Sequence, residues 1–292
     1  MKIGIHSART NTPDVDAVLA ELGEAAAAGL SSYWAAMLTG QDTLTTLALA
    51  ARGVPDIEVG TAVVPIPLRS PFALAQQALT IQQAIGGRLS LGIGTSHEAF
   101  AREQFRTEWD RPIDRARWYL TELRDIFSRA AGGEYSFPSA PIPQLLLGAV
   151  NPGMAAVAAD LADGVVTWAA GVRTLHDVIA PAVVSRSNPS PFRVVVGLPI
   201  CITSDVEGAR RRIFNRLGAH DGLPSYQKVL QREGASSVSD VALIGTELEV
   251  ADRVSSLAEA GATDFAAHLI VGSQSEHERT WEFLVGLASE ST

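Results

Sequence analysis

The sequence predicts an α/β protein built as a closed (β/α)8 TIM-like barrel. Eight short apolar runs alternate with segments whose apolar residues recur at helical spacing, which is typical of a parallel sheet. Most positions in the runs are apolar, as expected for strands that helices cover on both faces. The chain has 292 residues and no linker or low-complexity tract. We therefore expect one domain over residues 1–292, long enough for eight strand–helix units.

The predicted strands are apolar runs that end at glycine, proline or polar residues. In chain order they cover 2–7, 31–37, 57–65, 88–94, 144–150, 164–168, 193–203 and 264–271. Pro199 lies inside the seventh run. Because proline has no N–H to donate to a neighbouring strand, we expect it near the strand end or at a bulge.

Helix start signals separate these strands. Thr12-Pro13, Ser70-Pro71 and Asn151-Pro152 each place a capping residue before a proline at the first helical position. Thr246 and Glu249 have the spacing of a capping box. These signals predict helices that begin near residues 13, 71, 152 and 247.

Two segments depart from the simple alternation. The loop over 98–112 is longer than most connections, and long ordered loops are often functional. The segment 220–240 is predicted to form an inserted helix and loops. The helix after the first of these segments carries one apolar stripe, formed by Ala116, Leu120, Leu123 and Phe127.

The composition excludes several classes of protein. A net charge of −9 argues against extended contact with nucleic acid. The single cysteine, Cys201, excludes an intramolecular disulfide and a multi-cysteine zinc site, and no other metal-binding cluster is visible. No apolar run reaches the length of a membrane span, and no signal peptide precedes the strand that begins at Lys2. We expect a soluble, cytoplasmic globular protein.

The stretch from Arg88 to His97 is the first candidate site. It alternates apolar and small residues like a buried strand and then ends in Gly94, Thr95, Ser96 and His97. Glycine lets the backbone turn sharply or lie against a ligand, and chemistry is placed at the carboxyl ends of barrel strands. The alternative is a strand followed by an ordinary polar turn.

The turn after the fifth predicted strand is the second candidate site. A helix that begins at proline offers free N–H groups and a partial positive charge, which suit a phosphate. The alternative is a tight turn without a ligand. The residues of this turn are Gly148, Ala149, Val150, Asn151, Pro152 and Gly153.

Aromatic residues near other strand ends predict a wide mouth with aromatic walls. His6, Trp34, Trp168 and His268 each lie near the end of a predicted strand. Taken singly, each such residue more commonly belongs to the core or the rim. Taken together, they lead us to place His6, Trp34 and Trp168 in a substrate pocket.

Four motifs point to a family. They are Gly60-Thr-Ala-Val-Val-Pro65; Arg69-Ser-Pro71 with Ala75-Gln-Gln-Ala78; Gly87-Arg88-Leu-Ser-Leu-Gly92-Ile-Gly94; and Gly148-Ala149 with Asp163-Gly164. Each motif is weak alone, but their order along the chain is specific. From residue 1 to about residue 271, the chain resembles the luciferase-like monooxygenase superfamily, and within it the oxidoreductases that use the deazaflavin coenzyme F420.

The resemblance implies an isoalloxazine-type ring at the carboxyl ends of the strands, and hydride transfer between that ring and a substrate. By position, the ring would lie against Ala62 and Val63 and near the residues from Gly94 to His97. The ribityl-phosphate tail would reach the turn over 148–153. The resemblance also implies a non-proline cis peptide at Ala62–Val63 and places His97 near the reactive carbon, where an imidazole can transfer a proton.

Two departures limit the resemblance. Relatives commonly carry Arg-His-Pro where this chain has Arg69-Ser70-Pro71. The relatives that act on sugar phosphates carry a glutamate where His97 stands, so glucose 6-phosphate is not an expected substrate.

We therefore predict an oxidoreductase that transfers a hydride between coenzyme F420 and an unidentified small organic substrate. The sequence is compatible with a homodimer. One alternative is an FMN-dependent monooxygenase on the same barrel, and another is a non-enzymatic flavin-binding protein. A third is a barrel lyase or isomerase that binds a phosphorylated metabolite at Asn151-Pro152. That enzyme would need a lysine or paired carboxylates at strand ends, and the sequence shows neither.

Overall fold

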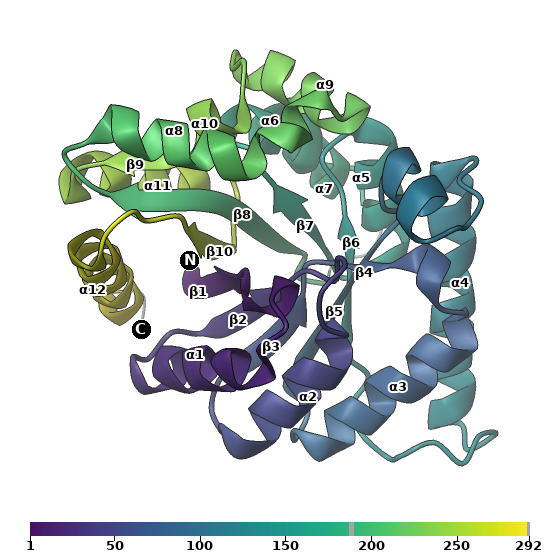
Figure 1. Ribbon diagram of the computed structural model, residues 1–292. Coiled ribbons are helices and arrows are strands. Elements are labelled where there is room, and N and C mark those ends of the chain that lie inside the picture. The colour runs from purple at the N-terminus through teal and green to yellow at the C-terminus, as the bar shows by residue number, and fades with distance from the viewer. Residues whose placement is uncertain (187–189, 291–292) are drawn as a thin grey trace.

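In the computed structural model, which describes residues 1–186 and 190–290, parallel strands close into a barrel and helices form its outer ring (Figure 1). Closure occurs because β10 pairs with β1 on one side and with β8 on the other. The predicted (β/α)8 barrel is confirmed. The barrel strands are β1 (Lys2–Ser7), β2 (Ser32–Ala35), β3 (Glu58–Thr61), β5 (Leu89–Gly94), β6 (Gln144–Gly148), β7 (Gly164–Trp168), β8 (Arg193–Ile202) and β10 (Asp264–Leu269).

Two short strands complete the sheet. The predicted third strand is interrupted at Ala62–Val63, where the peptide bond is cis as predicted, and it resumes as β4 (Val64–Pro65) beside β5. The strand β9 (Leu243–Gly245) pairs with the last residues of β8 and was not predicted. Several strands are shorter than predicted because their apolar runs continue into the loops of the barrel mouth.

Helices follow the strands as the alternation predicts. They are α1 (Val15–Ala27), α2 (Thr43–Gly53), α3 (Pro71–Ala84), α4 (Pro112–Ala131), α5 (Pro152–Leu161), α6 (Val172–Thr174), α7 (Ala180–Val184), α8 (Val206–Leu217), α9 (Pro224–Glu233), α10 (Val238–Val241), α11 (Glu247–Glu259) and α12 (Gln274–Glu290). The predicted apolar stripe of α4 is buried against the barrel. No helix in the described ranges is long and apolar enough to cross a membrane.

The helix caps confirm some of the predicted start signals and correct one. The hydroxyl of Ser70 caps α3, and Thr246 forms the predicted capping box at the start of α11. The cap predicted at Thr12-Pro13 is wrong. The carboxylate of Asp14 caps α1 instead, because the Thr12 hydroxyl donates its hydrogen bond to a carbonyl of the preceding turn.

The amino end of the barrel is held by the guanidinium of Arg193, at the start of β8. Arg193 pairs with Asp264 of β10 at 2.6 Å and with Glu58 of β3. It also donates to Ser90 Oγ of β5 at 2.9 Å and to Gln144 Oε1 of β6 at 3.1 Å. One buried cation therefore joins the first residues of strands from around the barrel.

Trp34 lies against this guanidinium and not in the substrate pocket, which corrects the prediction. Its ring is 5.0 Å from the Arg193 guanidinium carbon, and its Nε1 donates to Ser32 Oγ at 2.8 Å. The side chain is fully buried and packs with Leu146 and Val195. The side chain of Trp34 fills the barrel interior above the ion pairs, because β2 directs it inward and the indole N–H finds its acceptor on the same strand.

We expect Arg193→Met to lower the free energy of unfolding by roughly 3–5 kcal/mol, because it leaves the carboxylates of Glu58 and Asp264 without their cation. Urea unfolding followed by circular dichroism measures the change. Arg211→Met, on the exposed face of α8, is the control and should change the value by less than about 0.5 kcal/mol. A loss below about 1 kcal/mol in Arg193→Met would contradict this account of the barrel base.

Candidate active site

A cavity of about 2170 Å³ opens at the carboxyl ends of the strands. It is lined by residues at or after the ends of β1, β2, β3, β5, β6, β7 and β10, by part of α1, by part of the segment over 98–113, and by residues between Arg216 and Arg232. The structure brings into this one cavity nearly all of the predicted site residues, with Trp34 as the exception. They are His6, Ala62, Val63, Gly94, Thr95, Ser96, His97, Gly148, Ala149, Val150, Asn151, Pro152, Gly153 and Trp168.

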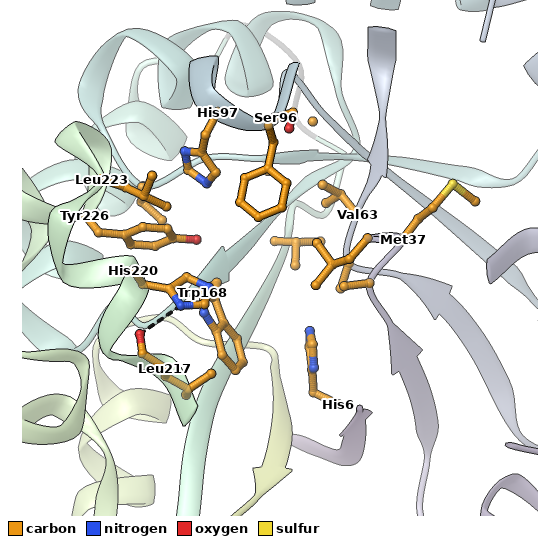
Figure 2. Close-up of a pocket in the computed structure, with 18 of the residues that line it drawn as sticks. His6, Met37, Val63, Ser96, His97, Trp168, Leu217, His220, Leu223 and Tyr226 are labelled. Carbon is orange, nitrogen blue, oxygen red and sulfur yellow. Dashed lines mark hydrogen bonds between the residues drawn. The ribbon is translucent and has the colours of Figure 1, made fainter. Parts of the chain in front are cut away.

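The side chain of Val63 lines the cavity and presents an apolar surface to it, which we call the Val63 seat (Figure 2). A Cβ atom added to Gly94 would lie 2.6 Å from Val63 Cγ2, and one added to Gly148 would lie 3.4 Å from Val63 Cγ1. Glycine is therefore required at Gly94 to make room for this valine, whereas a Cβ at Gly148 would make only ordinary van der Waals contact with it. Gly94 of β5 thus makes room for the side chain of Val63, whereas the sequence suggested that Gly94 itself would lie against a ligand.

The end of β5 places His97 in the cavity wall. Ser96 adopts the left-handed backbone region with φ of +63°, which is uncommon for a residue other than glycine and turns the chain sharply after the strand. The loop that follows folds back, and Trp109 Nε1 donates to the carbonyl oxygen of Thr95 at 3.2 Å. The predicted long loop over 98–112 is thus fastened to the strand end.

His97 is held by helix α9. Its Nδ1 lies 3.2 Å from Ser225 Oγ, and its ring centroid is 5.4 Å from that of Tyr226. Burial, together with the nearby imidazole of His220, lowers the pKa of His97 to about 4. His97 is therefore neutral near pH 7, and a neutral imidazole can accept a proton or a hydrogen bond.

The turn between β6 and α5 offers free donors. Asn151 is the N-cap residue, but its side chain does not cap the helix, because Nδ2 donates to the carbonyl of Ser225 at 3.1 Å. Ala149 N–H donates to Val166 O and is occupied. Among the described residues, the backbone N–H groups of Val150, Asn151 and Gly153 have no partner.

Arg232, on α9, adds a cation beside this turn. Its Nη1 donates to Val150 O at 3.2 Å, and its Nη2 lies 3.4 Å from Asn151 Oδ1. No carboxylate of the described chain forms an ion pair with it, since the adjacent Glu233 accepts hydrogen bonds from the backbone of Gly171 and Thr174. Half-buried Arg232 therefore faces the cavity with its charge uncompensated.

No residue of α9 was predicted from the sequence to lie in the site. The helix was expected within 220–240, and its signals are Pro224 at its first position and Gly234 in the left-handed region at its end. The sequence could not show that Ser225, Tyr226 and Arg232 would reach residues after β5 and β6. Those contacts depend on how the inserted segment folds back over the mouth.

A wall of aromatic rings faces Val63 across the cavity (Figure 2). The His6 and Trp168 ring centroids are 4.8 Å apart, and Trp168 lies 5.1 Å from His268 and 6.4 Å from His220. Burial lowers the pKa of His6 to about 3 and that of His268 to about 4. No group of His, Cys, Asp and Glu in the described residues is placed to hold a metal ion.

A family model now identifies the chain. The model described as luciferase-like monooxygenase matches residues 1–264. The protein belongs to the luciferase-like monooxygenase family. It is an enzyme, and its barrel is the fold that the resemblance implied.

Proteins that are similar to this chain in sequence or in fold differ in cofactor. A Mycobacterium tuberculosis protein, named as a candidate coenzyme F420-dependent oxidoreductase, is 27% identical over 277 residues, or 83% of this chain and 77% of the relative. A solved F420-dependent secondary alcohol dehydrogenase, in complex with an F420–acetone adduct, has a TM-score of 0.77 at 15% identity, covering 100% of this chain and 98% of that one. The FMN-bound oxygenating constituent of 3,6-diketocamphane monooxygenase from Pseudomonas putida has a TM-score of 0.72 at 16% identity, covering 99% and 97%. The shared fold alone does not select one cofactor.

The buried histidines predict a loss of stability in mild acid. A histidine with a folded-state pKa of about 4 binds fewer protons than the unfolded chain between pH 6.5 and 4, so the free energy of unfolding falls as the pH falls through that window. Between pH 6.5 and pH 5, we expect the free energy of unfolding of His268→Asn to fall by roughly 1–2 kcal/mol less than that of the parent protein. Urea unfolding at each pH measures this. The exposed His176→Asn is the control, and equal pH slopes in the parent and His268→Asn would disprove the assignment.

Proposed function

We propose that the protein is an oxidoreductase that transfers a hydride between coenzyme F420 and a small organic substrate. The observation that carries the proposal is the Val63 seat, which faces a wall of aromatic rings across one cavity. A planar tricyclic ring fits between an apolar side chain below and aromatic side chains beside it. The F420-dependent names of relatives support the choice of cofactor.

The far end of the cavity fits the acidic tail of such a cofactor. The free N–H groups of the turn over 149–153 lie at the start of α5, where the helix end favours negative charge. Arg232 adds a guanidinium, whose donors match the geometry of phosphate and carboxylate oxygens. We therefore assign the ring to Ala62, Val63 and the residues from Gly94 to His97, and the tail to the turn and Arg232.

The bound deazaflavin would supply the hydride chemistry, because it carries a carbon at the reactive position of the ring. The protein positions the reactants and excludes water from them. His97 lies at the end of β5 with a neutral ring, so it can take a proton from a donor in the cavity. Ser225 fixes the orientation of that ring through its contact with Nδ1.

An FMN-dependent monooxygenase remains the second candidate function. The similarity in fold to an FMN-bound enzyme favours it, and a single phosphate would also fit the turn over 149–153. The lyase or isomerase has less support, because Lys228, the lysine that lines the cavity within the described residues, lies exposed on α9 and not at a strand end.

We expect Arg232→Met to weaken F420 binding roughly 10–100-fold, because a hydrogen bond to a charged group contributes about 1.5–3 kcal/mol. Quenching of F420 fluorescence on titration gives the dissociation constant, and thermal unfolding shows whether the fold is kept. Arg211→Met, distant on α8, is the control. An unchanged dissociation constant in Arg232→Met would remove this residue from the tail site.

We expect His97→Ala to bind F420 nearly as well as the parent protein but to slow hydride transfer by about 10²–10⁴-fold. Single-turnover absorbance at the deazaflavin band measures the rate. Because the pKa of His97 is about 4, the neutral form predominates above pH 5, so the parent rate should stay level from pH 5.5 to 8. His176→Ala serves as the matched surface control. A full rate in His97→Ala would leave the residue only a contact to the cofactor.

A further inference from the structure

The aromatic wall contains two histidines whose protonation is fixed by the backbone. The Nδ1 atom of His268 lies 2.8 Å from the carbonyl oxygen of His6, and the Nδ1 atom of His220 lies 2.9 Å from that of Leu217. A carbonyl oxygen can only accept, so in each pair Nδ1 must carry the proton and donate it. Figure 2 shows the His220 bond as a dashed line, with the ring between Tyr226 and Trp168.

The other ring nitrogen of each histidine is therefore an acceptor. A neutral imidazole with its proton on Nδ1 has a lone pair on Nε2. Burial lowers the pKa of both residues, so both rings remain neutral near pH 7. Neither Nε2 has a hydrogen-bond partner within the described residues, and both rings line the cavity beside Trp168.

The wall around the two rings is mostly apolar, and the exposed guanidinium of Arg216 lies near enough to His268 to contribute to the lowering of its pKa. Trp168 lies between the two histidines, and Leu217 and Leu223 cover the same side (Figure 2). Charged residues that line the cavity are exposed at its rim or bonded to neighbours. The rim residues are Arg9, Glu24, Glu98, Arg102, Glu103, Arg216 and Lys228, and the bonded ones are Glu21 and Arg232.

We propose that His220, His268 and Trp168 form a recognition site for an uncharged substrate that carries two hydroxyl groups on an apolar ring or chain. This inference rests on the proposed function, since it names the substrate class of the same cavity. Each Nε2 atom accepts a hydrogen bond from one of the two hydroxyls, and the apolar body of the substrate packs on the indole of Trp168. We name this site the acceptor pocket.

The acceptor pocket discriminates against two kinds of analogue. An ether of the same shape has no hydrogen to donate, so both lone pairs would be desolvated without a partner. An anion would meet two acceptors and an indole ring, and the nearby cation, Arg216, is exposed to solvent, so burying the charge of the anion there is costly. The charge of a phosphorylated or carboxylated substrate would find no buried cation on this side of the cavity within the described residues.

Equilibrium binding of matched ligands tests the acceptor pocket. The probes are the 1,2-, 1,3- and 1,4-cyclohexanediols, which vary the hydroxyl spacing, their dimethyl ethers, and 4-hydroxycyclohexanecarboxylate. Calorimetry is performed on the protein with and without F420. We expect at least one diol to bind about tenfold more tightly than its ether and than the carboxylate.

Two variants locate the binding. His220→Asn and His268→Asn each keep a side-chain N–H near the Nδ1 position but remove the Nε2 acceptor. Each should weaken binding of the preferred diol roughly 2–10-fold and leave its ether within twofold. His277→Asn, at the edge of the same cavity and stacked on Trp281, is the matched control.

Any one of four results would overturn the proposal. They are equal affinity for diol and ether, tighter binding of the carboxylate than of every diol, no binding of any diol, and unaltered diol binding in both variants. A separate F420 titration of the same samples keeps the two questions apart. If F420 does not bind but the diol pattern holds, the proposed function fails and the acceptor pocket stands. If F420 binds and the diol pattern is absent, only the acceptor pocket fails.

Discussion

The buried ion pairs of Arg193 are the interaction on which the barrel depends. Strands from both sides of the closure contribute to them, with Glu58 on β3 and Asp264 on β10. A shift of one strand past its neighbour would separate these ion pairs and leave buried charges without compensation, which is costly. The intact cluster therefore fixes the register of the strands at this end. Trp34 fills the interior directly above. The amino end is thereby closed, and the large cavity is left to the carboxyl ends.

The site combines rigid and inserted parts. The strands supply the fixed part, in which Gly94 of β5 makes room for Val63. Helix α9 supplies the rest, because Ser225 contacts His97 and Arg232 contacts the turn before α5. One short helix therefore links the region assigned to proton transfer with the region assigned to the acidic tail.

The barrel could be predicted because the spacing of apolar residues in strands and helices is a local property of the sequence. The motif around Val63 could be recognised because its residues are contiguous. The sequence placed Trp34 in the pocket since it lies near the end of a strand, but whether an inward side chain faces the base or the mouth depends on its neighbours in the closed barrel. His220 and Ser225 belong to a segment without a clear pattern, so their approach to His97 could only come from tertiary structure. The turn around Asn151 was recognised, but its side-chain partners on α9 were not.

We expect this cavity to bind a deazaflavin in preference to a flavin. Parallel fluorescence titrations of the purified protein with F420 and with FMN test it most directly. F420 should bind saturably, and FMN should bind at least about tenfold more weakly, which corresponds to about 1.4 kcal/mol. Tighter binding of FMN, or no binding of either cofactor, would contradict it.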